Sequence, residues 1–257
     1  MDWMTTILTS LVILMAGLVH GIAGFGYAQV SMGLLPLFRD PATASVIFTI
    51  TAVASNGRVF WSVKEDFRFH DWILPVSGLI FGMPIGIYVF KNASRQQLQL
   101  LIGVILILAV VLITLMKQMD SVKEWIKEKE IEPDWKAGFI AGFLAGILGG
   151  AVAIPGPPMI VYGAFMISNE YWKSSRMKAI FTAFFGTLMA YRLGVLTYTG
   201  DVTTPLIGEA LIAIPALFIG AWVGIQIFKN IPEKVFVWFI LAGLTINAII
   251  LIVTSLI

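Results

Sequence analysis

Two strings of residues rich in glycine and proline interrupt long apolar stretches of the sequence. The first string is HGIAGFGY, from His20 to Tyr27, and the second is GGAVAIPGPP, from Gly149 to Pro158. A helix that restarts after such a break exposes backbone N–H groups, which carry partial positive charge and bind anions. Proline favours the first helical position, which suits Pro157 or Pro158. The strings therefore predict two helix N-termini that could bind an anion, unless their glycines only allow helices to pack closely.

Arginines and other polar residues near the strings extend this candidate site. Arg58 and Arg192 lie within predicted spans, and an arginine offers a planar fork of donors that suits an oxyanion. Their alternative role is snorkelling to the membrane surface. His20 and Tyr191 are candidate proton-relay groups, although a lone histidine can simply cap carbonyl groups. The candidate substrate-binding residues are Gly24, Phe25, Gly26, Gln29, Arg58, Gly149, Gly150, Pro155, Gly156, Pro157 and Arg192.

What the sequence lacks narrows the chemistry further. No Asp or Glu falls in the middle of a predicted span, which argues against a cation pathway and for an anionic substrate. The chain has no cysteine and two histidines, so it predicts neither a thiol nor a histidine metal site. A net charge of +2 gives no reason to expect nucleic acid. With no P-loop and no nucleophile–base set, we expect no enzymatic activity and no cofactor.

Composition places the chain in a membrane. Hydrophobic residues make up 58% of the 257 residues and charged residues only 12%, about half the share of a soluble protein. Six segments have the length of a membrane span, roughly 20 apolar residues. They are residues 42–63, 72–90, 97–116, 178–198, 207–228 and 234–256. Two further segments, 4–38 and 136–167, each contain one of the strings and are either one long kinked crossing or a re-entrant hairpin.

The distribution of positive charge favours hairpins. Cytoplasmic loops are enriched in Lys and Arg. Single crossings would divide the fifteen Lys and Arg residues outside the spans almost equally between the two sides. Two re-entrant hairpins put twelve on one side and three on the other. The chain is then expected to have both termini outside the cell and a cytoplasmic linker over residues 117–135.

An internal repeat completes the predicted architecture. GMPIGIYVFKN at residues 82–92 matches GAWVGIQIFKN at 220–230, an offset of 138 residues. GIAGFG at 21–26 matches GILGGA at 146–151, and Ile47-Phe48-Thr49 matches Ile180-Phe181-Thr182. We predict an all-α membrane protein of two inverted repeats, residues 1–116 and 136–257. Each has a broken or re-entrant helical hairpin plus three transmembrane helices, a pattern typical of secondary transporters.

The motifs GxAGFG, GxLGG and the following GPP, together with the charged central linker, resemble the TauE/SafE sulfite exporter family, of the 4-toluene sulfonate uptake permease type. The resemblance covers nearly the whole chain. It implies a secondary transporter of the bacterial or archaeal cytoplasmic membrane that expels sulfite, thiosulfate or organosulfonates such as sulfoacetate. The family's binding elements would correspond to Gly24-Phe25-Gly26 and to Gly149-Gly150 with Pro155-Gly156-Pro157. Matching the tips through GIAGFG puts Gly150 in the place of Phe25.

These observations give a leading hypothesis and an alternative. The leading hypothesis is export of a small sulfur-containing anion by alternating access, with the anion and membrane lipid as the expected partners. The alternative is an anion channel, or a transporter of a non-sulfur organic anion, on the same fold.

Overall fold

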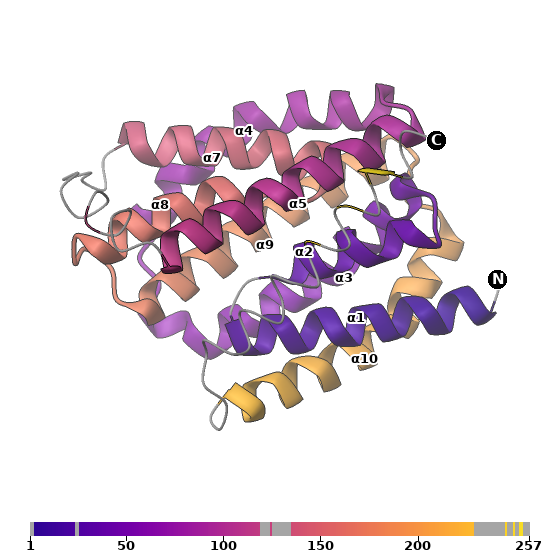
Figure 1. Ribbon diagram of the computed structural model, residues 1–257, viewed down its shortest axis with the longest axis horizontal. Coiled ribbons are helices and arrows are strands. Elements are labelled where there is room, and N and C mark those ends of the chain that lie inside the picture. Colours follow the sequence, from indigo (N-terminus) through magenta and orange to yellow (C-terminus); the bar gives the residue numbers. More distant parts are fainter. Residues whose placement is uncertain are drawn as a thin grey trace.

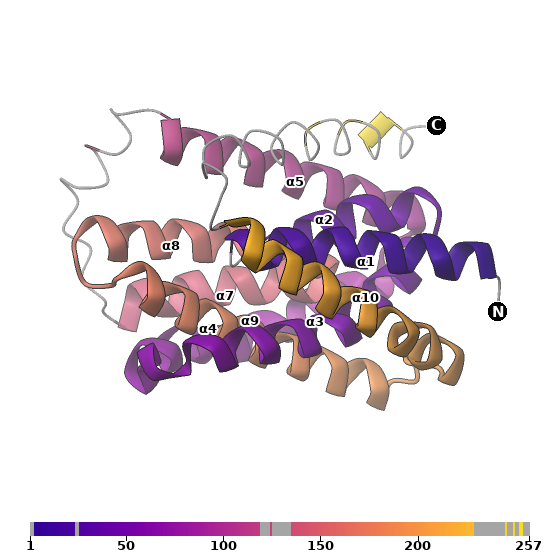
Figure 2. The same cartoon turned by 90° about the horizontal axis from the view of Figure 1, so that it is seen from below.

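The computed structural model describes residues 3–23, 26–118, 124, 135–228, 245, 249 and 252–253, and its regular elements are all helical. The helices are α1 (Trp3–Ala23), α2 (Tyr27–Leu34), η1 (Leu35–Leu37), α3 (Pro41–Val63), η2 (Lys64–Asp66), α4 (Phe69–Asn92), α5 (Arg95–Gln118), α7 (Trp135–Val152), α8 (Gly156–Ser168), α9 (Ser174–Tyr198) and α10 (Thr204–Phe228). The long helices lie roughly side by side in one bundle (Figures 1 and 2). The predicted all-α fold is confirmed.

The bundle has the features of a multi-pass membrane protein. Among the described residues, seven helices are long and apolar enough to cross a membrane: α1, α3, α4, α5, α7, α9 and α10. Large apolar side chains such as Phe81, Tyr88 and Trp222 are exposed on the outside of the bundle, where lipid would cover them. Five of the six predicted spans correspond to α3, α4, α5, α9 and α10. Most of the sixth, residues 234–256, and most of the linker lie outside the described residues.

The two unusual segments fold as asymmetric helical hairpins. In the first, α1 has 21 residues, about 31 Å, whereas α2 has only 8. After α2 the chain returns beside the beginning of α1, because Nε of Arg39 donates a 2.8 Å hydrogen bond to the Thr9 hydroxyl. In the second, α7 has 18 residues and α8 has 13. Each hairpin therefore has a first arm of spanning length and a shorter returning arm.

The hairpins enter from opposite ends of the bundle. In Figure 1, α1 begins at the right end, whereas α5 ends and α7 begins at the left end. We call these ends the N-terminal face and the linker face. The first helix of each half packs on a late helix of the other half: α1 on α10 and α7 on α4. This exchange is consistent with inverted repeats.

Glycines make both of these helix pairs close. A Cβ atom added at Gly17 would lie 2.6 Å from the backbone oxygen of Leu217, and one at Gly82 would overlap the backbone oxygen of Phe143. Gly86, Gly142, Gly146, Gly220 and Gly224 likewise face backbone of the partner helix. Backbone cannot move aside as a side chain can, so these positions require glycine. The prediction that the repeated glycines pack helices is confirmed.

The helix ends correct the sequence match between the hairpin tips by one helical turn. α2 begins at Tyr27 and α8 begins at Gly156. These two helix starts are 129 residues apart, whereas the GIAGFG match gave 125. Ile154, not Gly150, therefore corresponds to Phe25. A helix turn has 3.6 residues, so glycines spaced by four give two nearly equivalent alignments.

Candidate functional site

The two hairpin tips meet at a small buried cavity. Its lining includes Gly26, Tyr27 and Gln29 from the first tip and Pro155 and Gly156 from the second. The remaining lining residues come from α1, α2, α3, α8 and α9: His20, Ala28, Phe48, Asn56, Ile160, Phe185 and Met189. The cavity volume is about 30 Å³, enough for about two water molecules. This conformation is therefore closed around the tips.

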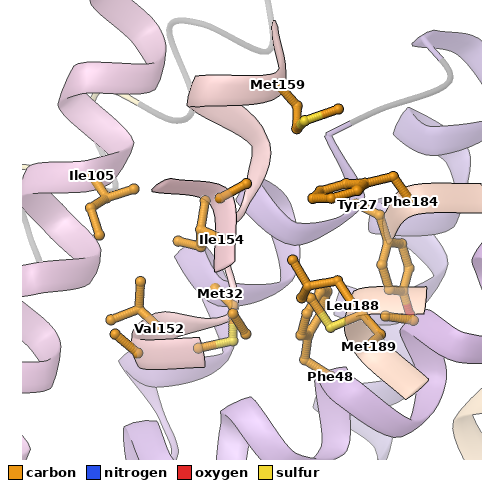
Figure 3. Packing of buried hydrophobic residues seen from close by; sticks show 14 of the residues in the cluster. Tyr27, Met32, Phe48, Ile105, Val152, Ile154, Met159, Phe184, Leu188 and Met189 are labelled. Atoms are coloured by element: carbon orange, nitrogen blue, oxygen red, sulfur yellow. The ribbon is translucent and has the colours of Figure 1, made fainter. Parts of the chain in front are cut away.

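Tyr27, which lines the cavity, belongs to a buried apolar cluster with side chains from both halves. Figure 3 shows Tyr27 and Met32 of α2 packed with Ile154 and Met159 from the second hairpin and with Leu188 of α9. All five residues are buried. Polar groups in such surroundings interact more strongly than in water because the local dielectric constant is low. A few donors at the cavity would therefore have a large effect on a bound ion.

The first tip supplies a set of backbone donors. Gly26 has φ of +93°, a left-handed conformation that suits glycine, and it is the N-cap of α2. The first N–H groups of α2, those of Tyr27, Ala28 and Gln29, have no acceptor one turn earlier within that helix. The Gln29 side chain is buried beside them and lines the same cavity. This tip therefore combines a helix N-terminus with a side-chain amide.

The second tip is chemically different although its shape is similar. α8 begins at Gly156 after the N-cap Pro155, so the first helical position is one residue before Pro157, where the sequence suggested it. Pro157 and Pro158 occupy the first turn. Prolines carry no N–H, so this helix start offers fewer donors than α2. Ala153, just after α7, has φ of +61°, which is uncommon for a residue with a side chain. The backbone of the second tip therefore makes a tight turn. The first tip provides most of the backbone N–H donors.

The tips touch through Gly156 and Gln29. A Cβ atom at Gly156 would lie only 2.6 Å from Nε2 of Gln29, so glycine there leaves room for the amide. His20 also lines the cavity, and its Nδ1 forms a 2.7 Å hydrogen bond with the Ser55 hydroxyl. Lys178 of α9 is half-buried and close enough to act electrostatically on His20. The described lining of the cavity contains hydrogen-bonding groups but no carboxylate.

Arg192 is buried beside the cavity and held by neutral acceptors. Its side chain is 0% exposed. Nη2 donates a 2.7 Å hydrogen bond to the Ser45 hydroxyl, Nη1 donates to Thr49, and Nε donates to the Gly150 carbonyl at 3.3 Å. The Phe90 ring lies 4.8 Å from the guanidinium carbon. Arg192 does not snorkel, and its charge remains in the bundle interior.

An open vestibule lies beyond Arg192 on the N-terminal face. It has a volume of about 500 Å³ and includes Phe90, Lys91 and Asp201 in its lining. From α3, residues 42, 43 and 46 line the vestibule, and residues 48 and 56 line the cavity. Arg192 bonds to residues 45 and 49 of the same helix. Arg192 therefore separates the vestibule from the cavity.

The structure brings together only part of the predicted site. His20, Gly26, Gln29, Pro155 and Gly156 line the cavity. Four others do not line it: Gly149 packs on Leu188, the Gly150 carbonyl accepts from Arg192, Pro157 lines a lateral apolar groove with α5, and Tyr191 is half-buried on α9. Arg58 is exposed on α3 and does not line the cavity. Gly24 and Phe25 lie outside the described residues.

Several residues of the site were missed from the sequence. Ser45 and Thr49 hold Arg192, and Ser55 holds His20. One feature of the sequence pointed to this part of α3: Ile47-Phe48-Thr49 matches Ile180-Phe181-Thr182. The match makes Ser45 the counterpart of Lys178. Ser45 and Lys178 therefore occupy equivalent positions near the starts of α3 and α9, which begin at opposite faces of the bundle.

The fold and the site together define a polytopic membrane protein in which two broken hairpins converge on one cavity, lined mainly by apolar side chains with a few hydrogen-bonding groups. This is the arrangement of a membrane transporter. The family model for the sulfite exporter TauE/SafE matches residues 9–251. The chain belongs to this family, and it is a membrane transporter. Neither a curated protein nor a solved structure matches the chain.

Proposed function

We propose that the protein exports a small sulfur-containing anion, such as sulfite, thiosulfate or an organosulfonate, by alternating access. The observation that carries this proposal is the convergence of two hairpin tips, from opposite faces, on one cavity whose described lining has no carboxylate. The family match supports sulfite as the first substrate to test. The anion would bind between Gly26, Gln29 and Gly156.

Electrostatics supports an anion at this place. The N-terminus of α2 carries partial positive charge, and its first N–H groups would be hydrogen-bond donors to the oxyanion. Arg192 adds a formal positive charge within the same buried region. No carboxylate lies in the described cavity lining, so a bound anion would act as a counter-charge to the helix N-terminus. Arg192 also interacts electrostatically with Asp201 of the vestibule, and an anion in the cavity would add to that attraction.

The closed cavity supports a carrier rather than an open pore. A space for about two water molecules must expand before a sulfur oxyanion can enter. In the proposed cycle, residues 1–116 and 136–257 move against each other, while the tips remain at the binding site. Both termini would face outside the cell, and the vestibule at Arg192 would be the exit. His20 and Tyr191 are the proposed proton-relay groups if export is coupled to protons.

A ligand screen on the purified protein tests the substrate class. We expect sulfite, thiosulfate or sulfoacetate to raise the melting temperature in a saturable way, with acetate and other carboxylates as controls. The same ligand should be exchanged by protein reconstituted in liposomes. Stabilisation by carboxylates alone would reject the sulfur assignment, and saturable binding without flux would reject transport of the bound ligand.

A further inference from the structure

Two acidic residues occupy corresponding positions in the two halves of the chain. Asp71 and Glu209 are 138 residues apart, the same offset that relates Gly82 to Gly220. Asp71 lies in the first turn of α4, and Glu209 lies in the second turn of α10. Their exposed fractions are only 4% and 7%. Buried carboxylates need partners, so their contacts are informative.

On the N-terminal face, Glu209 is bound by groups from the first half of the chain. Its Oε1 atom pairs with Nη2 of Arg39, which precedes α3, and accepts a 3.1 Å hydrogen bond from the Thr6 hydroxyl of α1. Nε of Arg39 donates to Thr9 of α1. One ion pair thus connects α10 to the first hairpin and to the start of α3.

On the linker face, the roles of the two halves are exchanged. Oδ2 of Asp71 lies 2.7 Å from Nη2 of Arg176, which belongs to the first turn of α9 in the second half. Nδ1 of His70 lies 3.7 Å from the other carboxylate oxygen of Asp71 and is largely exposed. A carboxylate of the first half is therefore held by an arginine of the second.

The pairing is more than a contribution to general stability. A buried ion pair is often no more stabilising than apolar packing of the same volume, because both charges lose their hydration. Removing one partner, in contrast, leaves a buried charge and strongly favours a state in which water reaches it. A pair that joins two moving parts therefore acts as a two-state contact, formed when that face is closed and hydrated when it is open.

We propose that Arg39–Glu209 and Asp71–Arg176 are the two gates of the transport cycle, one at each face. Both pairs are formed in this structure, and the cavity between them is closed. Breaking the first pair opens the path to the N-terminal face, and breaking the second opens the path to the linker face. The transport consequence rests on the proposed function, whereas the gating itself can be measured without substrate.

Thiol accessibility tests the gates directly, because the chain contains no native cysteine. Ala28, which lines the cavity, is replaced by cysteine as a reporter. In sealed vesicles of known orientation, a membrane-impermeant thiol reagent is applied to one face at a time. We expect Glu209→Gln to increase the labelling rate at least fivefold from the N-terminal face only. We expect Asp71→Asn to do the same from the linker face only.

Matched variants separate gating from damage to the fold. Gln96→Ala and Glu65→Gln alter exposed polar side chains at the two faces and should leave labelling within about twofold of the reporter protein. The exchange Arg39→Glu with Glu209→Arg restores opposite charges and should return labelling towards the closed value. Should Glu209→Gln fail to fold, Thr6→Ala removes one hydrogen bond from Glu209 and should give a smaller increase from the same face.

Two results would contradict the proposal that these ion pairs are gates. One is an unchanged labelling rate in folded Glu209→Gln and Asp71→Asn. The other is a labelling rate that increases equally from both faces. The proposed substrate can fail separately. Face-selective labelling together with no sulfite binding or flux would retain the gates and reject the sulfur anion.

Discussion

Nη2 of Arg192 on α9 donates a 2.7 Å hydrogen bond to the hydroxyl of Ser45 on α3, which joins the two halves of the protein beside the cavity. All the hydrogen-bond acceptors that hold this guanidinium in the described structure are neutral. A buried cation with neutral ligands keeps much of its electrostatic attraction for an anion nearby. The contact therefore links the architecture of the bundle to its proposed substrate.

Arg192→Gln is expected to weaken sulfite binding by about tenfold, equivalent to about 1.4 kcal/mol. The substitution removes the charge but keeps a side chain that can bond to Ser45. Isothermal titration at constant pH would measure the dissociation constant. Arg68→Gln removes an exposed arginine at the linker face and is the control, with little expected change. Arg58→Gln should have a smaller effect than Arg192→Gln, and equal affinities of all three variants would show that Arg192 does not act on the anion.

Gly156→Ala is expected to reduce sulfite affinity about tenfold without unfolding the protein. The added methyl group would meet the Gln29 amide, which is the flexible end of a side chain and can move out of the cavity. Gln29→Ala removes this obstacle. In the Gln29→Ala background, Gly156→Ala should therefore have much less additional effect, a non-additivity that a double-mutant cycle measures. Gly57→Ala on α3, where a Cβ atom meets nothing within 4 Å, is the control. Strictly additive losses would mean that the two residues do not share one site.

Gly82→Ala should lower the melting temperature by several degrees. Its methyl group would overlap the backbone of α7, so α4 and α7 must separate, and overpacking of this kind costs about 1–3 kcal/mol. Gly208→Ala is the control on α10, since a Cβ atom there has no neighbour within 4 Å. Thermal unfolding in detergent, followed by circular dichroism, compares the two. Equal melting temperatures would contradict the close packing of α4 on α7.

The Lys91–Asp201 pair predicts a pH dependence of stability at the N-terminal face. Partial burial alone would raise the pKa of Asp201, but hydrogen bonds from Thr199 and Lys91 and the nearby positive charges hold that pKa below its ordinary value of 3.8. A depressed carboxyl pKa gives stability that is present above the unfolded-state pKa and is lost as pH falls through the folded-state pKa. The excess stability of the wild type over Asp201→Asn should therefore be constant above about pH 5 and shrink below about pH 4.

Melting temperatures of the two proteins between pH 3 and pH 8 would measure this difference. Glu65→Gln, which alters an exposed carboxylate, is the comparison. A gap between wild type and Asp201→Asn that widens towards acid pH would contradict the assignment.

Much of the helical architecture could be predicted from apolar length, glycine spacing and the repeated string. Gly82 and Gly220 were placed at helix contacts because small residues four apart form a smooth face, and the structure puts both against backbone. The sequence could not fix the register of the hairpins. The reason is the equal spacing of four glycines: Gly138, Gly142, Gly146 and Gly150. Shifting the alignment by four residues hardly changes the sequence match, but it moves the aligned helices by about one full turn.

The two arginines show why the site was harder to predict than the fold. At the offset of 133 residues that relates α3 to α9, Arg58 corresponds to Tyr191, and Arg192 corresponds to Val59. A shift of one residue turns a side chain by about 100° around a helix. That rotation leaves Arg58 exposed and buries Arg192. Sequence spacing placed the two arginines at nearly equivalent positions along α3 and α9. It could not determine which of the two side chains faces the interior of the bundle.

Counterflow of sulfite in proteoliposomes tests the central claim most directly. Vesicles containing the purified protein are loaded with unlabelled sulfite or with an inert salt, and the uptake of labelled sulfite is measured at the same external concentration. Alternating access at a single closed site predicts faster initial uptake into the sulfite-loaded vesicles and saturation with external sulfite. Equal initial rates that rise linearly with concentration would contradict a carrier and indicate a channel.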